Sequence, residues 1–490
     1  MPGAPGPERL RTTTRMLIWM AVLIAGIAAL AAVPAANIGA VRDGFGVIGD
    51  QAGPGVVAAT HLYDDLADMD GQAATMLVLG DGTGFAETRS GAYQAYEKDQ
   101  ADANRQLESL GSGIDAIPGG PAAYIAVENG LSQYSQQVAQ AIYIDGQAHG
   151  QPPAMPPADA LARYQAATGL MHRADTGVLA EAQALIAGGQ STVDAAYYGA
   201  FGTIGQLRIW GIALTVLVVV ALLVVQRKLG RRFKRRVNPP LLLATVLSLI
   251  FGVLMFSALD ATHSSYVTQK TDAFDSVVAL WQGRAVAADM SAAEARWLLD
   301  RMSSTTASQV GADTEESLFD TEEAQVLARP GVLESGYAYN QDLDAAVRSF
   351  MSQINEPGVP TPILPFTKGY LGAELGNVTF PAEQLAANAA LQAYDAVIDD
   401  DAEFRGVVGT SADASTAVRY LTGTFDRDFA TFSTDLDATN VIDEQQFTVA
   451  TAHGGAGLGP WLWMPEGWAL LTAALVLLGF LPRLREYRRS

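Results

Sequence analysis

Four hydrophobic segments limit what this chain can fold into, because each approaches the roughly 20 apolar residues that a membrane-spanning helix requires. The 490-residue chain carries them at residues 16–36, 209–225, 239–258 and 461–481. Two long stretches, residues 37–208 and 259–460, separate the spans within each pair. The sequence therefore predicts one plan used twice: a span, a long connecting segment and a second span.

Basic residues indicate the side of the membrane that each segment occupies, because Lys and Arg favour the cytoplasmic ends of spans. Fourteen of the 31 Lys and Arg residues lie in residues 1–15, 226–238 and 482–490, which contain only two acids. The rest of the chain holds 50 acids and 17 bases. We therefore expect a multi-pass plasma-membrane protein with both termini in the cytoplasm and two extracytoplasmic domains, at residues 37–208 and 259–460.

The first span has an alternative interpretation. A basic start, an apolar stretch and the small residues Ala-Ala-Val-Pro-Ala-Ala at its end are also typical of a cleaved signal peptide. The apolar stretch is long for a signal peptide, so an uncleaved helix is favoured. Either interpretation leaves both long segments outside the cytoplasm.

Both long segments are predicted to be helical, because apolar residues recur in them at steps of three and four. The stripes are Leu62, Leu66, Met69, Ala73 and Leu77; Val286, Met290, Ala293 and Trp297; and Ala387, Leu391, Tyr394 and Ile398. Loop-forming Pro and Gly clusters separate the helices at residues 117–121, 152–157, 329–331 and 357–365. The chain has no cysteine. The predicted fold class is an all-α membrane protein with four transmembrane helices and two extracytoplasmic four-helix-bundle-like domains.

The two halves share residues at constant spacing, which predicts an internal tandem duplication. One block of matches is offset by 221 residues, and it includes the pairs Val56 and Val277, and Met69 and Met290. A later block is offset by 243 residues and includes Tyr96 and Tyr339. Further on, Tyr134 matches Tyr394. The growing offset indicates longer loops in the second copy.

The motifs give no support for catalysis or for a cofactor. None of the five histidines lies at metal-ligand spacing from another, and His61 and His172 are interpreted as surface or hydrogen-bonded residues. Acid clusters at residues 64–68, 313–323 and 399–403 are interpreted as solvated faces. Kinase and nucleophile-elbow motifs are absent from the sequence, and acidic segments disfavour nucleic-acid binding. The prediction is a non-enzymatic protein with no catalytic, cofactor-binding or metal-binding residue.

The central basic loop is the one candidate contact site. Its positive charges suit anionic lipid headgroups, and they also suit an acidic cytosolic partner. The candidate residues are Arg227, Lys228, Arg231, Arg232, Lys234, Arg235 and Arg236.

Four spans, two helical extracytoplasmic domains, a short basic loop and an alanine-rich, cysteine-free composition resemble the actinobacterial four-span membrane sensors of the GlnX type. This resemblance rests on architecture over the whole chain. It implies an extracellular glutamine/glutamate-binding lipoprotein and a cytosolic Ser/Thr kinase of the PknG type as partners. The implied function is the relay of an extracellular amino-acid signal to that kinase.

Two alternatives remain open from the residues themselves. The protein could be a structural envelope protein that scaffolds a transporter or a cell-wall complex. It could also bind a small ligand directly, in a pocket between the helices of an extracytoplasmic domain. The helical domains resemble chemoreceptor ligand domains, although the chain has no signalling coiled coil after either pair of spans.

Overall fold

A computed structural model of the chain describes residues 7–80, 84–233, 238–303, 306–331, 336–354, 364–410 and 414–489. In these ranges the regular secondary structure is helical, apart from an isolated antiparallel bridge between Ala328 and Lys368. Four helical stretches are long and apolar enough to cross a membrane: Thr14–Leu79, Val178–Leu229, Pro239–Met302 and Met464–Pro482. The prediction of an all-α membrane protein is therefore confirmed.

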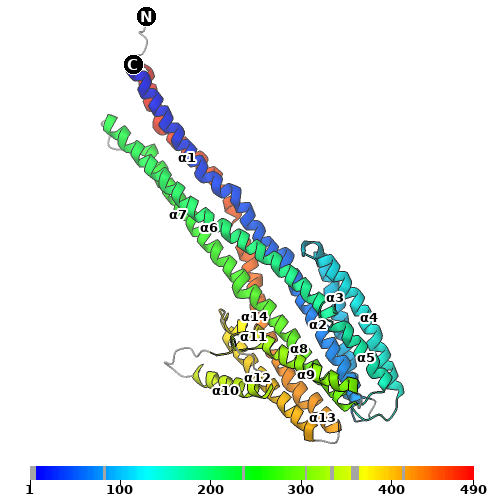
Figure 1. Ribbon diagram of the computed structural model, residues 1–490. Coiled ribbons are helices and arrows are strands. Elements are labelled where there is room, and N and C mark those ends of the chain that lie inside the picture. Colours follow the sequence, from blue (N-terminus) through cyan, green and yellow to red (C-terminus); the bar gives the residue numbers. More distant parts are fainter. Residues whose placement is uncertain are drawn as a thin grey trace. The chain divides into compact units, whose positions relative to one another are not determined.

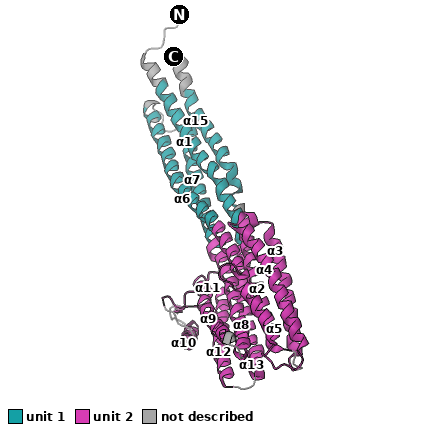
Figure 2. Ribbon diagram, turned by 45° about the vertical axis from the view of Figure 1, so that its right-hand side comes forward, with its two compact units in different colours: residues 1–48, 194–269, 449–490 teal, residues 49–193, 270–448 magenta. Residues whose placement is uncertain are grey.

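The chain divides into two compact units, coloured separately in Figure 2. Unit 1 contains residues 1–48, 194–269 and 449–490, and unit 2 contains residues 49–193 and 270–448. Unit 1 therefore collects the apolar spans, and unit 2 collects residues of both long segments between them. The two long segments are predicted to be two domains, and helices from both of them lie in unit 2.

Unit 1 is built from long helices that run alongside one another (Figure 1). They are α1 (Pro7–Gly46), the later part of α6 (Val178–Phe233), α7 (Pro239–Val267) and α15 (Met464–Arg489). Small residues allow close approach, as is usual between helices in lipid. A Cβ placed on Gly26 would lie 3.3 Å from Val218, and one on Gly479 would lie 2.8 Å from Leu241.

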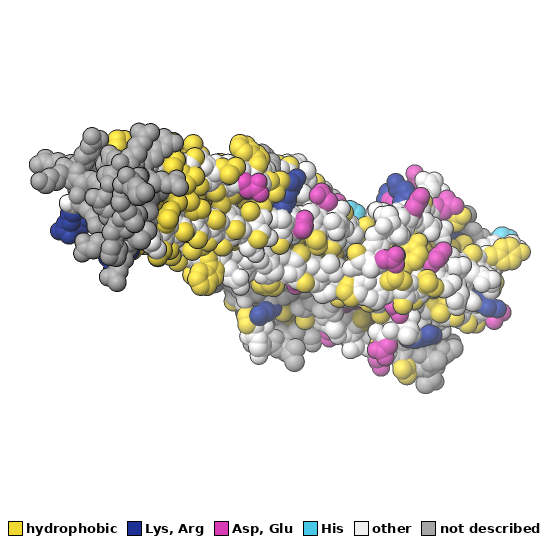
Figure 3. Space-filling view, turned by 90° about the horizontal axis from the view of Figure 1, so that it is seen from above, with side chains coloured by type: hydrophobic (Ala, Val, Ile, Leu, Met, Phe, Trp, Pro, Cys, Tyr) yellow, Lys and Arg dark blue, Asp and Glu magenta, His cyan; other side chains and the backbone are white. Residues whose placement is uncertain are grey.

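Two side chains tie α7 to α15 within this unit. The indole of Trp468 donates to the carbonyl oxygen of Leu247 at 3.1 Å, and Asn238 donates to the carbonyl oxygen of Gly479 at 3.0 Å. Large apolar side chains of unit 1 face outward, and side chains of this kind gather on the surface in Figure 3. The outward set includes Ile209, Leu217, Val253 and Leu470. A surface of this kind suits hydrocarbon, where the backbone polar groups are already satisfied within each helix.

Unit 2 places helices from the two long segments against each other. The first segment supplies α2 (Ala52–Leu79), α3 (Ala86–Gly111), α4 (Gly120–Gln147), α5 (Ala158–Met171) and the start of α6. The second supplies α8 (Asp275–Met302), α9 (Thr306–Val326), α10 (Gly336–Ile354), α11 (Tyr370–Leu375), α12 (Glu383–Thr410), α13 (Ala414–Tyr420) and most of α14 (Asp426–Ala456). Helices α2 and α8 pack on each other and are buried along most of their length.

The predicted stripes form the core of unit 2. Every residue of the three stripes on α2, α8 and α12 is buried. Residues 152–157 lie between α4 and α5 as predicted, whereas the predicted loop at residues 117–121 ends within the first turn of α4. Of the predicted loop at 357–365, residues 357–363 lie outside the described part of the chain.

Positions 221 residues apart in the sequence lie next to each other in the structure. A Cβ placed on Gly71 of α2 would lie 3.4 Å from the Cβ of Ala292 of α8. In unit 1 the rings of Phe45 and Tyr266 have centroids 3.8 Å apart. Two π-helical segments, Val47–Gln51 and Thr268–Phe274, also begin 221 residues apart.

Candidate functional site

An ion pair between α2 and α8 lies at the centre of unit 2. The guanidinium Nη1 of Arg296 donates to Asp70 Oδ2 at 2.8 Å, and its Nη2 donates to Asp289 Oδ1 at 3.0 Å. Its Nε donates to Glu315 Oε2 of α9 at 2.7 Å. All three guanidinium nitrogens are thus used, and the Arg296 side chain is only 3% exposed.

Residues of the first segment complete this arrangement around Asp70. The hydroxyl of Tyr134 donates to Asp70 Oδ1 at 2.8 Å, and Tyr164 lies 3.4 Å from the same oxygen. His172, directly after α5, places Nε2 3.2 Å from Asp70 Oδ2 and Nδ1 3.4 Å from Asp289 Oδ2. We call these residues the Asp70 cluster: Asp70, Tyr134, Tyr164, His172, Asp289, Arg296 and Glu315.

The charges of the cluster determine its protonation. Burial alone would raise the pKa of Asp70, but the hydrogen bond from His172 and the charge of Arg296 lower it to about 2. Burial likewise opposes ionisation of Asp289, yet His172 and Arg296 lower its pKa. Burial lowers the pKa of His172, and the carboxylates of Asp289 and Asp70 outweigh that effect and raise it. Arg296 and His172 therefore favour the ionised forms of Asp70 and Asp289 despite the burial of both carboxyl groups.

Asp70, His172 and Asp289 have the donor types and proximity of a metal site. Arg296 already pairs with both carboxylates, so the arrangement is satisfied as an ion-pair network without a metal. His172 is thus a hydrogen-bonded partner residue, which was one of its two predicted roles. His61 lies on α2 with its ring centroid 4.0 Å from that of Trp281, and burial lowers its pKa to about 4.

The prediction that the acid clusters are solvated faces is wrong for four of their residues. These are Asp64, Glu322, Glu323 and Asp400, each at most 8% exposed. Burial and then the charge of Asp289 raise the pKa of Glu322 well above its usual range. A raised pKa favours the neutral carboxyl, and a neutral carboxyl can donate a hydrogen bond to a carboxylate. Asp64 lies 3.5 Å from the guanidinium of Arg284, which also pairs with Asp437.

Two pockets flank the packed pair α2 and α8, and each is lined by both segments. The first, which we call the Arg296 pocket, has a volume of 340 Å³ and lies between α5, α8 and α9. Its polar lining includes Gln165, Thr168, Arg296, Asp300, Thr314 and Glu315. The second has a volume of 320 Å³, lies between α2, α3, α8 and α14, and includes Asp68 and Asp426. Both volumes suit a small polar solute.

The predicted basic contact residues lie at one end of unit 1. Arg227, Lys228 and Arg231 are exposed on the last turns of α6. The side chain of Arg232 and residues Lys234, Arg235 and Arg236 lie outside the described part of the structure.

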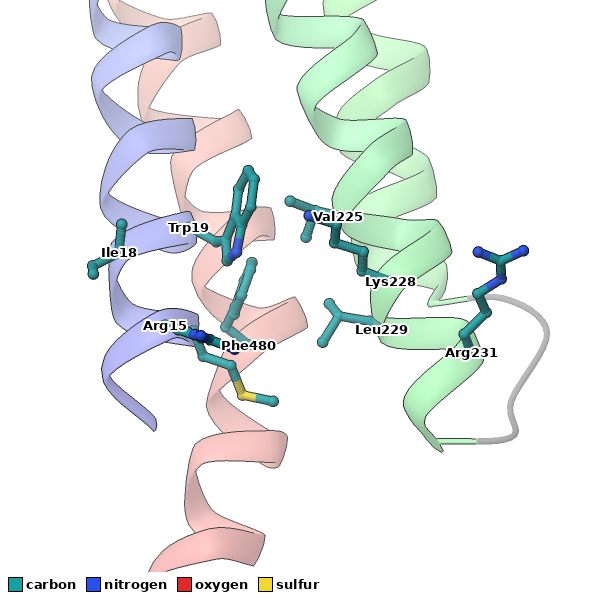
Figure 4. A pocket seen from close by; sticks show the side chains of 9 residues that line it. Arg15, Ile18, Trp19, Val225, Lys228, Leu229, Arg231 and Phe480 are labelled. Atoms are coloured by element: carbon teal, nitrogen blue, oxygen red, sulfur yellow. The ribbon is translucent and has the colours of Figure 1, made fainter. Parts of the chain in front are cut away.

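A groove of 740 Å³ lies beside these residues, and we call it the basic groove. Figure 4 shows Trp19 of α1 and Phe480 of α15 extending toward Val225 and Lys228 of α6. The ammonium of Lys228 lies 4.4 Å from the centre of the Trp19 ring, which is a cation–π distance. Arg15 and Arg231 also line the groove. Its lining combines apolar surface with three cations, a combination that suits an anionic amphiphile.

Sequence reasoning missed the Asp70 cluster and both pockets. Asp70 and Arg296 are 226 residues apart and belong to no motif. The only available signal was that ionisable residues interrupt apolar helices: Asp70 follows Met69 of a predicted stripe, and Arg296 precedes Trp297 of another.

Comparison with known proteins gives one match. Residues 44–198 match the family model described as the actinobacterial sensor domain. This stretch contains Asp70, Tyr134, Tyr164 and His172. No curated protein and no solved structure matches the chain. The family match supports a sensor role for this membrane protein and suggests that it is not an enzyme.

Proposed function

We propose that this protein is a transmembrane sensor that relays an extracellular amino-acid signal to a cytosolic partner, such as a Ser/Thr kinase. The main support for this proposal is the match of residues 44–198 to the sensor-domain family, because those residues supply four members of the Asp70 cluster. The Arg296 pocket beside that cluster is lined by the polar side chains of Gln165, Thr168, Asp300 and Thr314. A polar lining of this size suits a small polar solute such as an amino acid, so the pocket is the proposed site of direct detection.

The basic groove is the proposed output site. Arg227, Lys228 and Arg231 are exposed cations, and an acidic surface of a cytosolic protein would be attracted to them. This part of the proposal rests on the predicted topology, in which residues 226–238 face the cytoplasm. Anionic lipid competes for the same charges.

We also infer that the halves arose by duplication. Both the sequence and the structure support this inference. Gly71 packs on Ala292, and Phe45 packs on Tyr266, and the two residues of each pair are 221 positions apart in the sequence. A duplicated sensor has two related pockets, and the pair flanking α2 and α8 fits that expectation.

Direct detection of an amino acid by the Arg296 pocket is tested with the full-length protein in lipid nanodiscs. We expect glutamine or glutamate to raise the melting temperature of the wild type by ligand linkage. Thr314→Phe should abolish that rise, since Thr314 lines the Arg296 pocket. Thr321→Phe is the matched control: both threonines are exposed on α9 and bond the carbonyl four residues earlier. If neither amino acid shifts the wild type, direct detection is wrong, and binding of a solute-binding lipoprotein becomes the test of indirect detection.

Binding of a cytosolic partner to the basic groove is tested by crosslinking in intact cells. We expect the wild type to capture a cytosolic kinase, and the triple change Arg227→Gln, Lys228→Gln and Arg231→Gln to reduce that capture. Unchanged capture by the triple variant contradicts the role of the basic groove. Capture of transporter or wall-synthesis proteins, with no kinase, would favour the scaffold alternative.

A further inference from the structure

Three buried carboxyl groups converge in unit 2, away from the Asp70 cluster. They belong to Glu374 of α11, Glu383 at the start of α12 and Asp443 of α14, and we call them the carboxylate triad. One oxygen from each lies within 4.8 Å of the others. The three residues are 1%, 0% and 0% exposed, respectively. Burial this complete is rare for carboxyl groups unless each has a partner.

Most oxygens of the carboxylate triad make no hydrogen bond of normal geometry. Both oxygens of Glu374, both of Asp443 and Oε1 of Glu383 are buried without a hydrogen bond of normal geometry. Glu383 Oε2 accepts from the backbone N–H groups of Thr379 at 2.7 Å and Phe380 at 2.6 Å. Those two bonds fix the Glu383 carboxylate at the start of α12 and leave its other oxygen free.

No ion pair of the described residues includes a member of the triad. Burial, with the neighbouring acids adding to it, raises the pKa of Glu374 to about 8 and that of Asp443 to about 9. Only the nearby hydroxyl of Ser276 acts on Glu374 in the opposite direction. The raised pKa values favour the neutral carboxyls, so without an ion the site avoids buried charge by holding protons. A bound cation would replace those protons.

A neutral oxygen on the same helix also lacks a partner. Asn440 precedes Asp443 by three residues, so the two side chains share one face of α14. Asn440 is 3% exposed, and its amide oxygen is buried with no hydrogen bond. Carboxylate and amide oxygens together are the ligand types that calcium prefers.

We propose that Glu374, Glu383, Asp443 and Asn440 form a calcium-binding site. Calcium binds oxygen at about 2.3–2.6 Å, so two oxygens on opposite sides of the ion lie up to about 4.6–5.2 Å apart. Three oxygens that all lie within 4.8 Å of one another are close enough to bind one such ion together. Magnesium binds at about 2.0–2.1 Å and retains several waters, for which a fully buried set of carboxylates is less suited.

The bound ion would connect three parts of the second segment. Asn377, between α11 and α12, donates to the carbonyl oxygen of Thr271 at 2.8 Å and to Ser276 Oγ at 2.9 Å. Calcium at the carboxylate triad therefore joins α14 to a loop that is already anchored at the start of α8. This role is structural and does not depend on the proposed amino-acid signal.

The test uses the full-length protein in nanodiscs, stripped with EGTA and then titrated with CaCl2 or MgCl2 into the millimolar range, where extracellular calcium modules bind. We expect one calcium per chain by equilibrium dialysis with radioactive calcium, and a melting temperature several degrees higher with CaCl2. Asp443→Asn and Glu374→Gln should each lose that rise. Both should melt no lower than the wild type in EGTA, because each removes a buried, uncompensated acid.

The matched control is Asp435→Asn, the same change on the same helix, and it should keep the full response to calcium. The proposal is overturned if the wild type binds no calcium, or if the triad variants respond like the control. An equal response to MgCl2 would overturn the choice of calcium. These results are independent of amino-acid binding, so failure here leaves the proposed sensor function intact.

Discussion

The guanidinium of Arg296 lies 2.8 Å from a carboxylate oxygen of Asp70, and neither residue is more than 3% exposed. One residue belongs to the second long segment and the other to the first. Their pair therefore joins the two segments inside unit 2. Because both charges are buried, removing one member leaves the other without compensation, which is far costlier than losing a surface pair.

Arg296→Met should lower the free energy of unfolding by about 3–5 kcal/mol, because Asp70 and Asp289 would remain buried without their cation. Chemical denaturation of the full-length protein in detergent measures this loss. Arg105→Met is the control, since its side chain is 72% exposed, and it should change stability by no more than about 0.5 kcal/mol. Adding Asp70→Asn and Asp289→Asn to Arg296→Met should recover part of the loss. Equal stability of the Arg296 and Arg105 variants would contradict the ion-pair interpretation.

Tyr134→Phe should cost about 1.5–3 kcal/mol, because it removes a buried hydrogen bond to an ionised carboxylate. The same helix offers a matched control in Tyr143→Phe, since Tyr143 is 69% exposed. The control should leave the unfolding free energy unchanged. Equilibrium denaturation compares the two variants, and an equal effect would show that the hydroxyl of Tyr134 is not a stabilising donor.

His172 should make stability depend on pH. Its pKa is raised in the folded protein by Asp289 and Asp70, against the effects of burial and of Arg296. When the pKa of a histidine is higher in the folded state than in the unfolded state, its protonation stabilises the folded protein. This stabilisation is fully present below the unfolded-state pKa of about 6.5, and it is lost as the pH rises through the folded-state pKa. The difference in unfolding free energy between the wild type and His172→Gln should therefore be largest at mildly acid pH and shrink as pH rises. A difference that stays constant from acid to alkaline pH would rule out protonation of His172 as its source.

Gly188 and Gly199 on α6 should respond oppositely to alanine. A Cβ on Gly188 would lie 2.7 Å from the carbonyl oxygen of Pro118, whereas one on Gly199 meets nothing within 4 Å. We expect Gly188→Ala to destabilise by about 1–3 kcal/mol through overpacking. Gly199→Ala should stabilise by about 0.4–1 kcal/mol through reduced chain entropy. Thermal melts of both variants show whether each substitution raises or lowers the melting temperature. A higher melting temperature for both variants would mean that the backbone at Pro118 shifts readily to accommodate the added methyl group.

Local features of the fold were predictable from the sequence, and distant pairings were not. Leu62 and Leu66 were predicted to face a core because helical periodicity is a property of neighbouring residues, and both are fully buried. Asp64 lies between them and is predicted to face solvent, because the sequence does not reveal that Arg284 of α8 lies beside it. The carboxylate triad comes from three helices without a shared motif. Its members become neighbours only once α11, α12 and α14 have packed.

The two π-helical segments, Val47–Gln51 and Thr268–Phe274, have a consequence for tolerance to insertion and deletion. A π turn accommodates an additional residue, and one residue changes the angular phase of an α-helix by roughly 100°. Each half carries such a turn before its central helix, so Gly71 and Ala292 meet after matching phase changes. Loss of a residue from either turn would change the angular phase between the helical residues before it and those after it by about 100°. Each turn should therefore tolerate insertion and deletion less well than a loop does.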